Sequence, residues 1–393
     1  MLQRNILLFK IYYFFWRFKP LATLMIVYFS QIMQSYTLAT AVFAIFNISY
    51  AVLKIPSGLI SDKIGRKQVI IVANGCLFSA FCLLAISGQF KVKWLLYIFS
   101  VIWGIGEALS AGTIEALMYE TTQNLKQSDK FYVVYAKSMF FDQFGCALGA
   151  FSAMAITYFL PLQVVAWFAA LPAFMQFFIS FYFINPNVQK KHISISVEDV
   201  LIALKQFKNN KCLLFYALAD IYFSTLGDIS HRLESAYFKL FASDWIINFA
   251  RMLKHFFGML GFAFMSYLGK FSKVKIFFVS ITCNIVVRIT ALIFNNIGAP
   301  FIHMFINFFY ATAATAKTDI LQQEYKAEYR ATTQSIIEFV KGVYMAGIML
   351  VLGIFADAYS IYSVMILLVI LRIFGLFLVL MLKKYAKISQ QIA

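Results

Sequence analysis

Charged residues are scarce in this sequence, and their scarcity excludes an ordinary soluble globular domain. Only 13% of the 393 residues are charged, whereas 62% are hydrophobic and 18% are aromatic. The five cysteines are scattered and form no CxxC pair. The sequence therefore indicates neither a disulfide framework nor a cysteine metal site.

Motifs for catalysis and for nucleotide binding are missing as well. The sequence has no glycine-rich phosphate loop with its lysine, no serine elbow and no cluster of histidine and cysteine. We therefore expect no catalytic residue, no metal ion and no other cofactor, and the chain is not expected to be an enzyme or to use ATP.

What is present is a series of apolar segments near the length of about 20 residues that a helix needs to cross a bilayer. Two of them, 69–86 and 362–382, are apolar on nearly every side, unlike the alternating strands of a barrel. The sequence predicts an all-α integral membrane protein with twelve transmembrane helices in two six-helix bundles. The predicted spans are 8–33, 38–60, 69–88, 94–116, 132–159, 162–184, 212–230, 245–268, 274–295, 299–318, 331–355 and 360–382.

The formal net charge of +17 follows the predicted membrane topology. Basic residues gather in alternate loops, at 63–67, 126–130, 190–208, 270–275, 326–330 and 383–387. The loops between them are poor in lysine and arginine. The positive-inside rule then places both termini in the cytoplasm, which requires an even number of spans. Nucleic acid is not an expected partner, whereas membrane lipid is.

A polar, basic interruption divides the chain after the sixth span. It opens with the helix-stopping sequence Asn185-Pro186-Asn187. Within it, Val197, Val200, Leu201, Leu204 and Phe207 recur at helical spacing. The sequence predicts an N-terminal bundle at 1–185, a cytoplasmic linker with a short amphipathic helix at 186–211, and a C-terminal bundle at 212–393. The short helix would be a latch between the bundles, a contact with anionic lipid, or a plain linker.

One loop carries an ordered motif. Between the second and third spans the sequence reads GLISDKIGRK, with Gly58, Asp62, Lys63, Gly65, Arg66 and Lys67 as its polar and glycine positions. This pattern, in this position of a chain with six spans on each side, resembles the signature loop of the major facilitator superfamily. The stretches 55–58, 110–117 and 330–332 are also similar to members of that family.

The resemblance implies a gate that fastens the two bundles on the cytoplasmic side. Asp62 would meet the start of the eleventh span at 331–334, and Arg66 would pair with Glu120 at the end of the fourth. Gly58 would allow a close helix approach, and Gly65 would permit the tight turn. The alternative is positive-inside charge without a gating role.

Two departures from the family pattern stand out. Lys54 occupies a position where similar sequences often carry an acid, so any role of that acid is lost or inverted. The loop at 268–273 is a degraded copy of the motif with Gly269 in the aspartate position. The two bundles are therefore expected to have unequal gates.

Charges inside the predicted spans are the candidate transport residues, because a charge near the bilayer centre is costly and usually faces a partner or an aqueous cavity. Glu107 is the first candidate for proton coupling or substrate contact, since it lies beside a stripe of small residues on the fourth span. The alternative role is a structural ion pair with Arg17 or another buried arginine. The remaining candidates are Asp142, Asp220, Glu338, Arg17 and Arg288.

Together these features predict a secondary transporter that moves a small organic solute by alternating access, coupled to protons. Export of a drug-like or siderophore-like compound is the first candidate, and uptake of an anionic metabolite is the alternative. A membrane receptor derived from a transporter, which binds ligand without moving it, is a further alternative. The family resemblance implies a bacterial cytoplasmic membrane.

Overall fold

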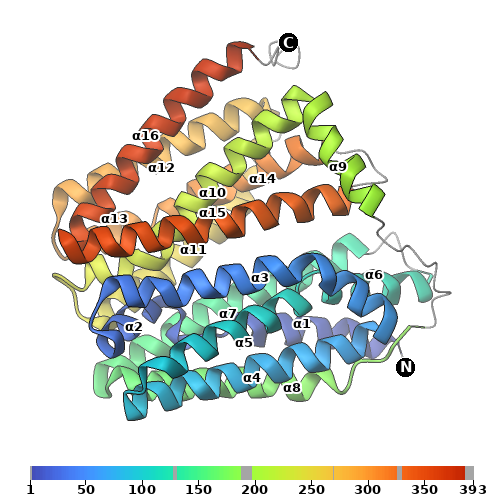
Figure 1. Ribbon diagram of the computed structural model, residues 1–393, viewed down its shortest axis with the longest axis horizontal. Coiled ribbons are helices and arrows are strands. Elements are labelled where there is room, and N and C mark those ends of the chain that lie inside the picture. Colours follow the sequence, from blue (N-terminus) through green and yellow to red (C-terminus); the bar gives the residue numbers. More distant parts are fainter. Residues whose placement is uncertain (1, 127–130, 187–196, 269, 325–329, 386–393) are drawn as a thin grey trace. The chain divides into compact units, whose positions relative to one another are not determined.

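The computed structural model describes residues 2–126, 131–186, 197–268, 270–324 and 330–385, and every regular element among them is a helix (Figure 1). Helices satisfy all of their backbone hydrogen bonds internally, which hydrocarbon surroundings require. By length and composition, eight described helical segments can cross a membrane; they lie in α3, α4, α5 with α6, α7, α8, α10, α12 and α15.

The helices divide into two compact units. The N-terminal unit contains α1 (Gln3–Arg17), the short 3₁₀ helix η1 (Pro20–Thr23), α2 (Met25–Met33), α3 (Tyr36–Ile64), α4 (Arg66–Phe90), α5 (Lys93–Ser110), α6 (Thr113–Asn124), α7 (Phe131–Phe159) and α8 (Leu162–Ser180). The C-terminal unit contains α9 (Val197–Asn209), α10 (Lys211–Phe238), α11 (Asp244–Leu268), α12 (Lys273–Phe294), α13 (Ala299–His303), α14 (Ile306–Glu324), most of α15 (Arg330–Ala358) and α16 (Ile361–Tyr385).

The predicted all-α membrane fold with twelve spans is confirmed, because each predicted span corresponds to one helix or to one broken helix. The first span is divided into α1, η1 and α2, the fourth into α5 and α6, and the tenth into α13 and α14. The seventh span is longer than predicted: α10 continues to Phe238 instead of ending near 230. The positions 231–238, predicted to lie in a loop, are therefore helical.

The break in the first span follows from the dipeptide Lys19-Pro20. A residue before proline is disfavoured in the helical region, and Lys19 has φ −117° and ψ 89°. Proline is well suited to the first turn of the next helix, where Pro20 begins η1. The break lies directly after Arg17, the last residue of α1, and contains Lys19.

The break in the fourth span is at Gly112, whose φ of 87° is a conformation that favours glycine. Glu115 accepts a hydrogen bond from the Gly112 amide at 2.8 Å and caps α6. Lys54 donates to the carbonyl oxygen of Ala111 at 3.0 Å, at the end of α5. A cation at a helix C-terminus is favourable, so Lys54 stabilises this break.

The short helix predicted in the linker is present as α9, but its buried face differs from the prediction. Leu201 and Leu204 are exposed, whereas Ala203 and Gln206 are buried. The small side chain of Ala203 lets α9 pack closely, and Gln206 donates to Thr333 at 3.4 Å. The predicted borders of the linker stay a prediction, since residues 187–196 lie outside the described part of the chain.

Candidate functional site

The break in the first span brings a lysine against Glu107 on α5. Lys19 Nζ lies 2.7 Å from Glu107 Oε1, and the two side chains are 17% and 15% exposed. The indole N–H of Trp16 donates to Glu107 Oε2 at 3.1 Å, and that of Trp103 donates to Oε1 at 3.3 Å. The carboxylate therefore has three donors, and its cation is Lys19 instead of the arginine considered from the sequence.

A second ion pair lies beside the first. Arg17 Nε donates to Asp142 Oδ1 at 2.9 Å, while Gln143 donates to Oδ2 at 3.0 Å. A Cβ added at Gly145 would lie 2.3 Å from the carbonyl oxygen of Phe14, so only glycine allows α7 to approach α1 this closely. Asp142 and Gly145 therefore both lie on the side of α7 that packs against α1.

These two pairs form the N-terminal charge site, defined as Arg17, Lys19, Glu107 and Asp142. The Asp142 side chain is 5% exposed, but that of Arg17 is 57% exposed. The site therefore combines enclosed carboxylates with cations that reach its surface. Neither pair is fully enclosed, since the cation of each is at least 17% exposed.

The predicted contact between Arg66 and Glu120 is present. Arg66 Nε donates to Glu120 Oε1 at 3.1 Å, and the same guanidinium donates to Ser61 Oγ. Gly65, which links α3 to α4, has φ 109°, a conformation that favours glycine, as predicted for this tight turn. The gating role of the loop stays a prediction.

The other positions of the loop behave differently. Lys63 is exposed, and the backbone amide of Lys67 donates to Asn185 Oδ1 at 3.1 Å. A Cβ added at Gly58 would meet no described atom within 4 Å, so the close helix approach predicted there is not observed. The side chain of Asp62 lies outside the described part of the structure, and so does its predicted contact with 331–334.

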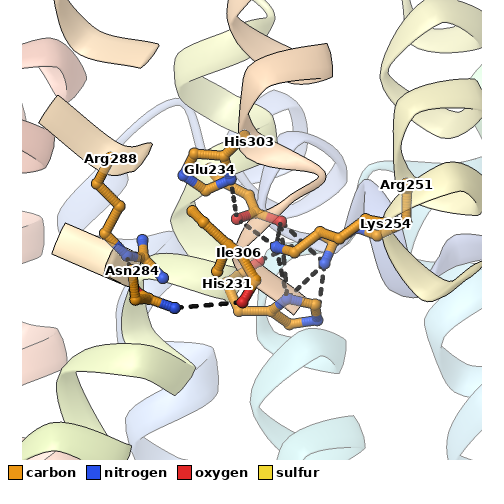
Figure 2. Close-up of polar contacts among 8 residues, drawn as sticks. All are labelled: His231, Glu234, Arg251, Lys254, Asn284, Arg288, His303 and Ile306. Carbon is orange, nitrogen blue, oxygen red and sulfur yellow. Dashed lines mark hydrogen bonds and ion pairs between the residues drawn. The ribbon is translucent and has the colours of Figure 1, made fainter. Parts of the chain in front are cut away.

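The C-terminal unit contains a more buried cluster around a carboxylate that sequence reasoning missed (Figure 2). Glu234 on α10 accepts from Lys254 Nζ at 2.7 and 2.8 Å and lies 2.9 Å from Arg251 Nη1. His303 Nδ1 on α13 lies 3.1 Å from Glu234 Oε2. The imidazole of His231 completes the group, 3.6 Å from Glu234 Oε1. We call these five residues the Glu234 cluster: His231, Glu234, Arg251, Lys254 and His303.

Burial separates the Glu234 cluster from the N-terminal charge site. The side chains of Glu234, Arg251 and Lys254 are each 5% exposed or less. The Lys254 ammonium is therefore enclosed by protein. A fully enclosed carboxylate between two cations is typical of a structural ion pair that is costly to disrupt.

The remaining acidic candidates in the C-terminal unit differ in their ion-pair partners. Asp220 on α10 pairs with Lys317 on α14 at 2.6 Å and accepts a hydrogen bond from Ser224. Glu338 on α15 lies one turn from Lys341, whose ammonium pairs with Asp228 at 2.9 Å. Asp220 and Glu338 act electrostatically on the same lysine, Lys341, although only Asp228 pairs with it directly.

Arg288 on α12 is buried near the Glu234 cluster but outside its ion pairs. Its Nε donates to Asn284 Oδ1 at 2.9 Å, and Asn284 in turn donates to the carbonyl oxygen of Ile306 at 3.3 Å (Figure 2). The Arg288 side chain thus has an amide partner and no described carboxylate partner.

Sequence signals existed for some of the missed residues. Lys19 precedes a proline in the first span, which marks a local break, and Lys317 lies inside the predicted tenth span. Glu234 has no such signal, because the hydropathy of the sequence predicts a loop after position 230. A seventh span that continued from 230 to 238 would include Glu234.

Comparison with known proteins agrees with this architecture. A family model described as the Major Facilitator Superfamily matches residues 7–348. No curated protein sequence matches this chain. Among solved structures, the nucleoside transporter NupG is 14% identical, with a TM-score of 0.77, over 98% of this chain and 99% of that one.

Two further structures show the same fold. A D-xylose-proton symporter is 11% identical, with a TM-score of 0.73, over 96% of this chain and 95% of that one. A POT family transporter in complex with 5-aminolevulinic acid is 12% identical, with a TM-score of 0.75, over 98% and 96%. The family match over most of the chain carries the assignment, and this multi-pass membrane protein therefore belongs to the major facilitator superfamily of secondary transporters.

Proposed function

We propose that the chain is a proton-coupled transporter of a small organic anion, and that the N-terminal charge site performs the coupling. The observation that carries this proposal is the pairing of Lys19 with Glu107 at the break of the first span. Discontinuous spans with exposed polar groups are where transporters of several folds bind substrates and coupling ions.

Charge balance links the proton to the anion. While Glu107 is ionised, its carboxylate neutralises the Lys19 ammonium. A proton added to Glu107 removes that negative charge and leaves Lys19 without a counter-ion. An anionic group of the solute can then take the place of the carboxylate beside Lys19 and near the exposed Arg17.

The same balance sets the direction of coupling. Proton binding to Glu107 and anion binding to Lys19 favour each other, and this coupling is necessarily reciprocal. Proton and anion therefore move together. This favours uptake of an anionic metabolite over export of a drug-like or siderophore-like compound, which is the first candidate from the sequence. One of the structural neighbours is a D-xylose-proton symporter, which is consistent with this mode.

The loop between α3 and α4 is the proposed cytoplasmic gate. Arg66 joins it to Glu120 on α6, and α6 follows the break in the span that carries Glu107. A change at the coupling site thus has a short route to the loop through α5 and α6. This proposal keeps both termini in the cytoplasm and places the chain in a bacterial cytoplasmic membrane.

The test is a transport measurement in proteoliposomes with internal pH recorded. Purified protein is challenged with a panel of small organic anions and, as the opposing class, cationic amphiphiles. We expect an anion to drive proton movement in the wild type and not in Glu107→Gln. Asp220→Asn is the matched control, since it removes a carboxylate paired with lysine elsewhere.

Three outcomes would contradict the proposal. Anion flux without proton movement would remove the coupling, and proton movement driven only by cationic amphiphiles would replace the substrate class. Binding without flux in the folded wild type would support the receptor alternative.

A further inference from the structure

Arg372 in the C-terminal unit is a buried arginine without a described partner. It lies on α16, eleven residues after the first residue of that helix, and is 4% exposed. Its Nε and Nη2 atoms are buried and form no hydrogen bond with any described residue. A guanidinium has five donors in a fixed planar arrangement and stays charged, so this environment leaves a substantial desolvation cost uncompensated.

The nearest helices add another cation and no free acid. Arg288 on α12 acts electrostatically on Arg372, and so does Asp228. Asp228, however, is paired with Lys341, while Glu234 is enclosed by Arg251 and Lys254. Among the described residues, neither Arg288 nor Arg372 forms an ion pair with a carboxylate. The region therefore has positive charge without a matching negative side chain.

A small cavity adjoins Arg288, and Val369 in its lining lies one turn before Arg372 on α16. Its lining comes from α10, α12, α13 and α16 and consists of Ser230, Tyr237, Arg288, Ala291, Leu292, His303, Met365 and Val369. The Ser230 hydroxyl is buried and has no hydrogen-bond partner among the described residues. One turn earlier on α10, a Cβ added at Gly227 would lie 3.4 Å from Arg372 Nη2, so the guanidinium faces α10 beside the cavity.

We propose that Arg288, Arg372 and Ser230 bind a small oxyanion, a carboxylate or phosphate group, between α10, α12 and α16. Two guanidinium groups supply the charge and the planar donor geometry that such groups bind. The Ser230 hydroxyl supplies a further donor. This site is distinct from the N-terminal charge site and is argued from different residues, so it stands whether or not the proposed proton coupling is correct.

A purely structural role fits the observations less well. A structural arginine in a membrane helix normally pairs with a carboxylate or with backbone carbonyl groups. Arg372 Nε and Nη2 do neither in the described part of the unit. A bound oxyanion would satisfy these donors and reduce the repulsion between Arg372 and Arg288.

The experiment measures thermal unfolding of the detergent-purified full chain while inorganic phosphate or acetate is titrated at constant ionic strength. We expect a saturable rise of the unfolding midpoint in the wild type, since a ligand that binds only the folded state stabilises it. Arg372→Met should lose this response, and Arg288→Met should weaken apparent affinity about tenfold or more, as expected for a lost charged hydrogen bond.

The anion-free midpoint separates binding from structure. Replacing an uncompensated buried charge by an apolar side chain of similar size is often neutral or stabilising. Arg372→Met should therefore unfold at the same or a higher temperature than the wild type without anion. A lower midpoint in a variant that still folds would indicate a structural arginine and overturn the proposal.

The control variant is Arg4→Met, which removes an exposed arginine and should respond to anions like the wild type. An equal response in wild type, Arg372→Met and Arg4→Met would be a general salt effect and would overturn the proposal. A parallel titration with a short-chain anionic phospholipid distinguishes the source of the oxyanion. If only the lipid raises the unfolding midpoint and Arg372→Met abolishes that rise, the site binds a lipid head group. If neither the free anions nor the lipid raises the midpoint, the site is excluded.

Glu107→Gln provides the remaining comparison. This variant should lose proton-coupled transport and keep the phosphate response, because Glu107 belongs to the N-terminal unit. Failure of the anion site and failure of the coupling proposal are thus separately observable.

Discussion

The N-terminal charge site and the Glu234 cluster use the same residue types in opposite ways. Glu107 pairs with Lys19 at a break in a span, and both side chains are more than a tenth exposed. Glu234 pairs with Lys254 and Arg251 inside continuous helices, with every side chain 5% exposed or less. The comparison teaches that burial, and not residue type, separates an exchangeable pair from a structural one.

The two sites also differ in the backbone that carries their cations. Around Lys19 the backbone leaves the helical conformation, so the lysine can move without disrupting a helix. Arg251 and Lys254 lie one turn apart within α11, and movement of either requires the helix to move. A transport site needs the first arrangement, whereas the second fixes helix packing.

Glu234→Gln should have the largest effect on stability. Removing this charge leaves Arg251 and Lys254 buried without a counter-ion, which costs about 3–5 kcal/mol when one partner of a buried pair is lost. The measurement is the unfolding midpoint and the yield of folded protein in detergent. Glu107→Gln is the control and should cost much less. Equal losses of stability in the two variants would show that the two carboxylates do not differ in this way.

Gly145→Ala should cost less, about 1–3 kcal/mol, because the added methyl group would collide with the backbone of α1. It should also separate Arg17 from Asp142. Thermal unfolding and transport are measured together, and Gly347→Ala serves as the control, since no described atom lies within 4 Å of a Cβ at that position. Normal behaviour of Gly145→Ala would show that α7 does not need this close approach.

Asp142→Asn should destabilise the protein less than Glu234→Gln does, because the Arg17 side chain is 57% exposed and is not confined to this one partner. The amide oxygen can still accept the hydrogen bond. A loss as large as that of Glu234→Gln, measured under the same conditions, would mean that the N-terminal charge site is structural too.

The smallest effect is expected at the loop between α3 and α4. Arg66 and Glu120 are each 21% exposed, so their coupling energy should be about 0.3–1 kcal/mol. A double-mutant cycle with Arg66→Gln and Glu120→Gln measures it from thermal unfolding. If the loop is a gate, transport rates should change more than stability does. Unchanged transport in both single variants would show that the loop is not a gate and that its charges only follow the positive-inside rule.

Much of the fold could be predicted because apolar length and turn chemistry are local properties. The ends of most spans agree with the helices within a few residues, and the pairing of Arg66 with Glu120 was predicted from the motif. The breaks at Lys19 and Gly112 and the extension of α10 to Phe238 were not predicted. A helix in a membrane can continue through polar residues when its neighbours satisfy them, and a single sequence does not reveal those neighbours.

The sequence by itself determined the membrane class, the number of spans and the glycine needed at Gly65, since hydropathy and backbone conformation depend on nearby residues. Only the tertiary structure decided which carboxylate meets which cation. Lys19 and Glu107 are far apart in the chain, as are Glu234 and His303, and their pairing depends on the register of packed helices. That register is set by close contacts such as α7 against α1 at Gly145, where an atom-level fit decides the position of every charge nearby.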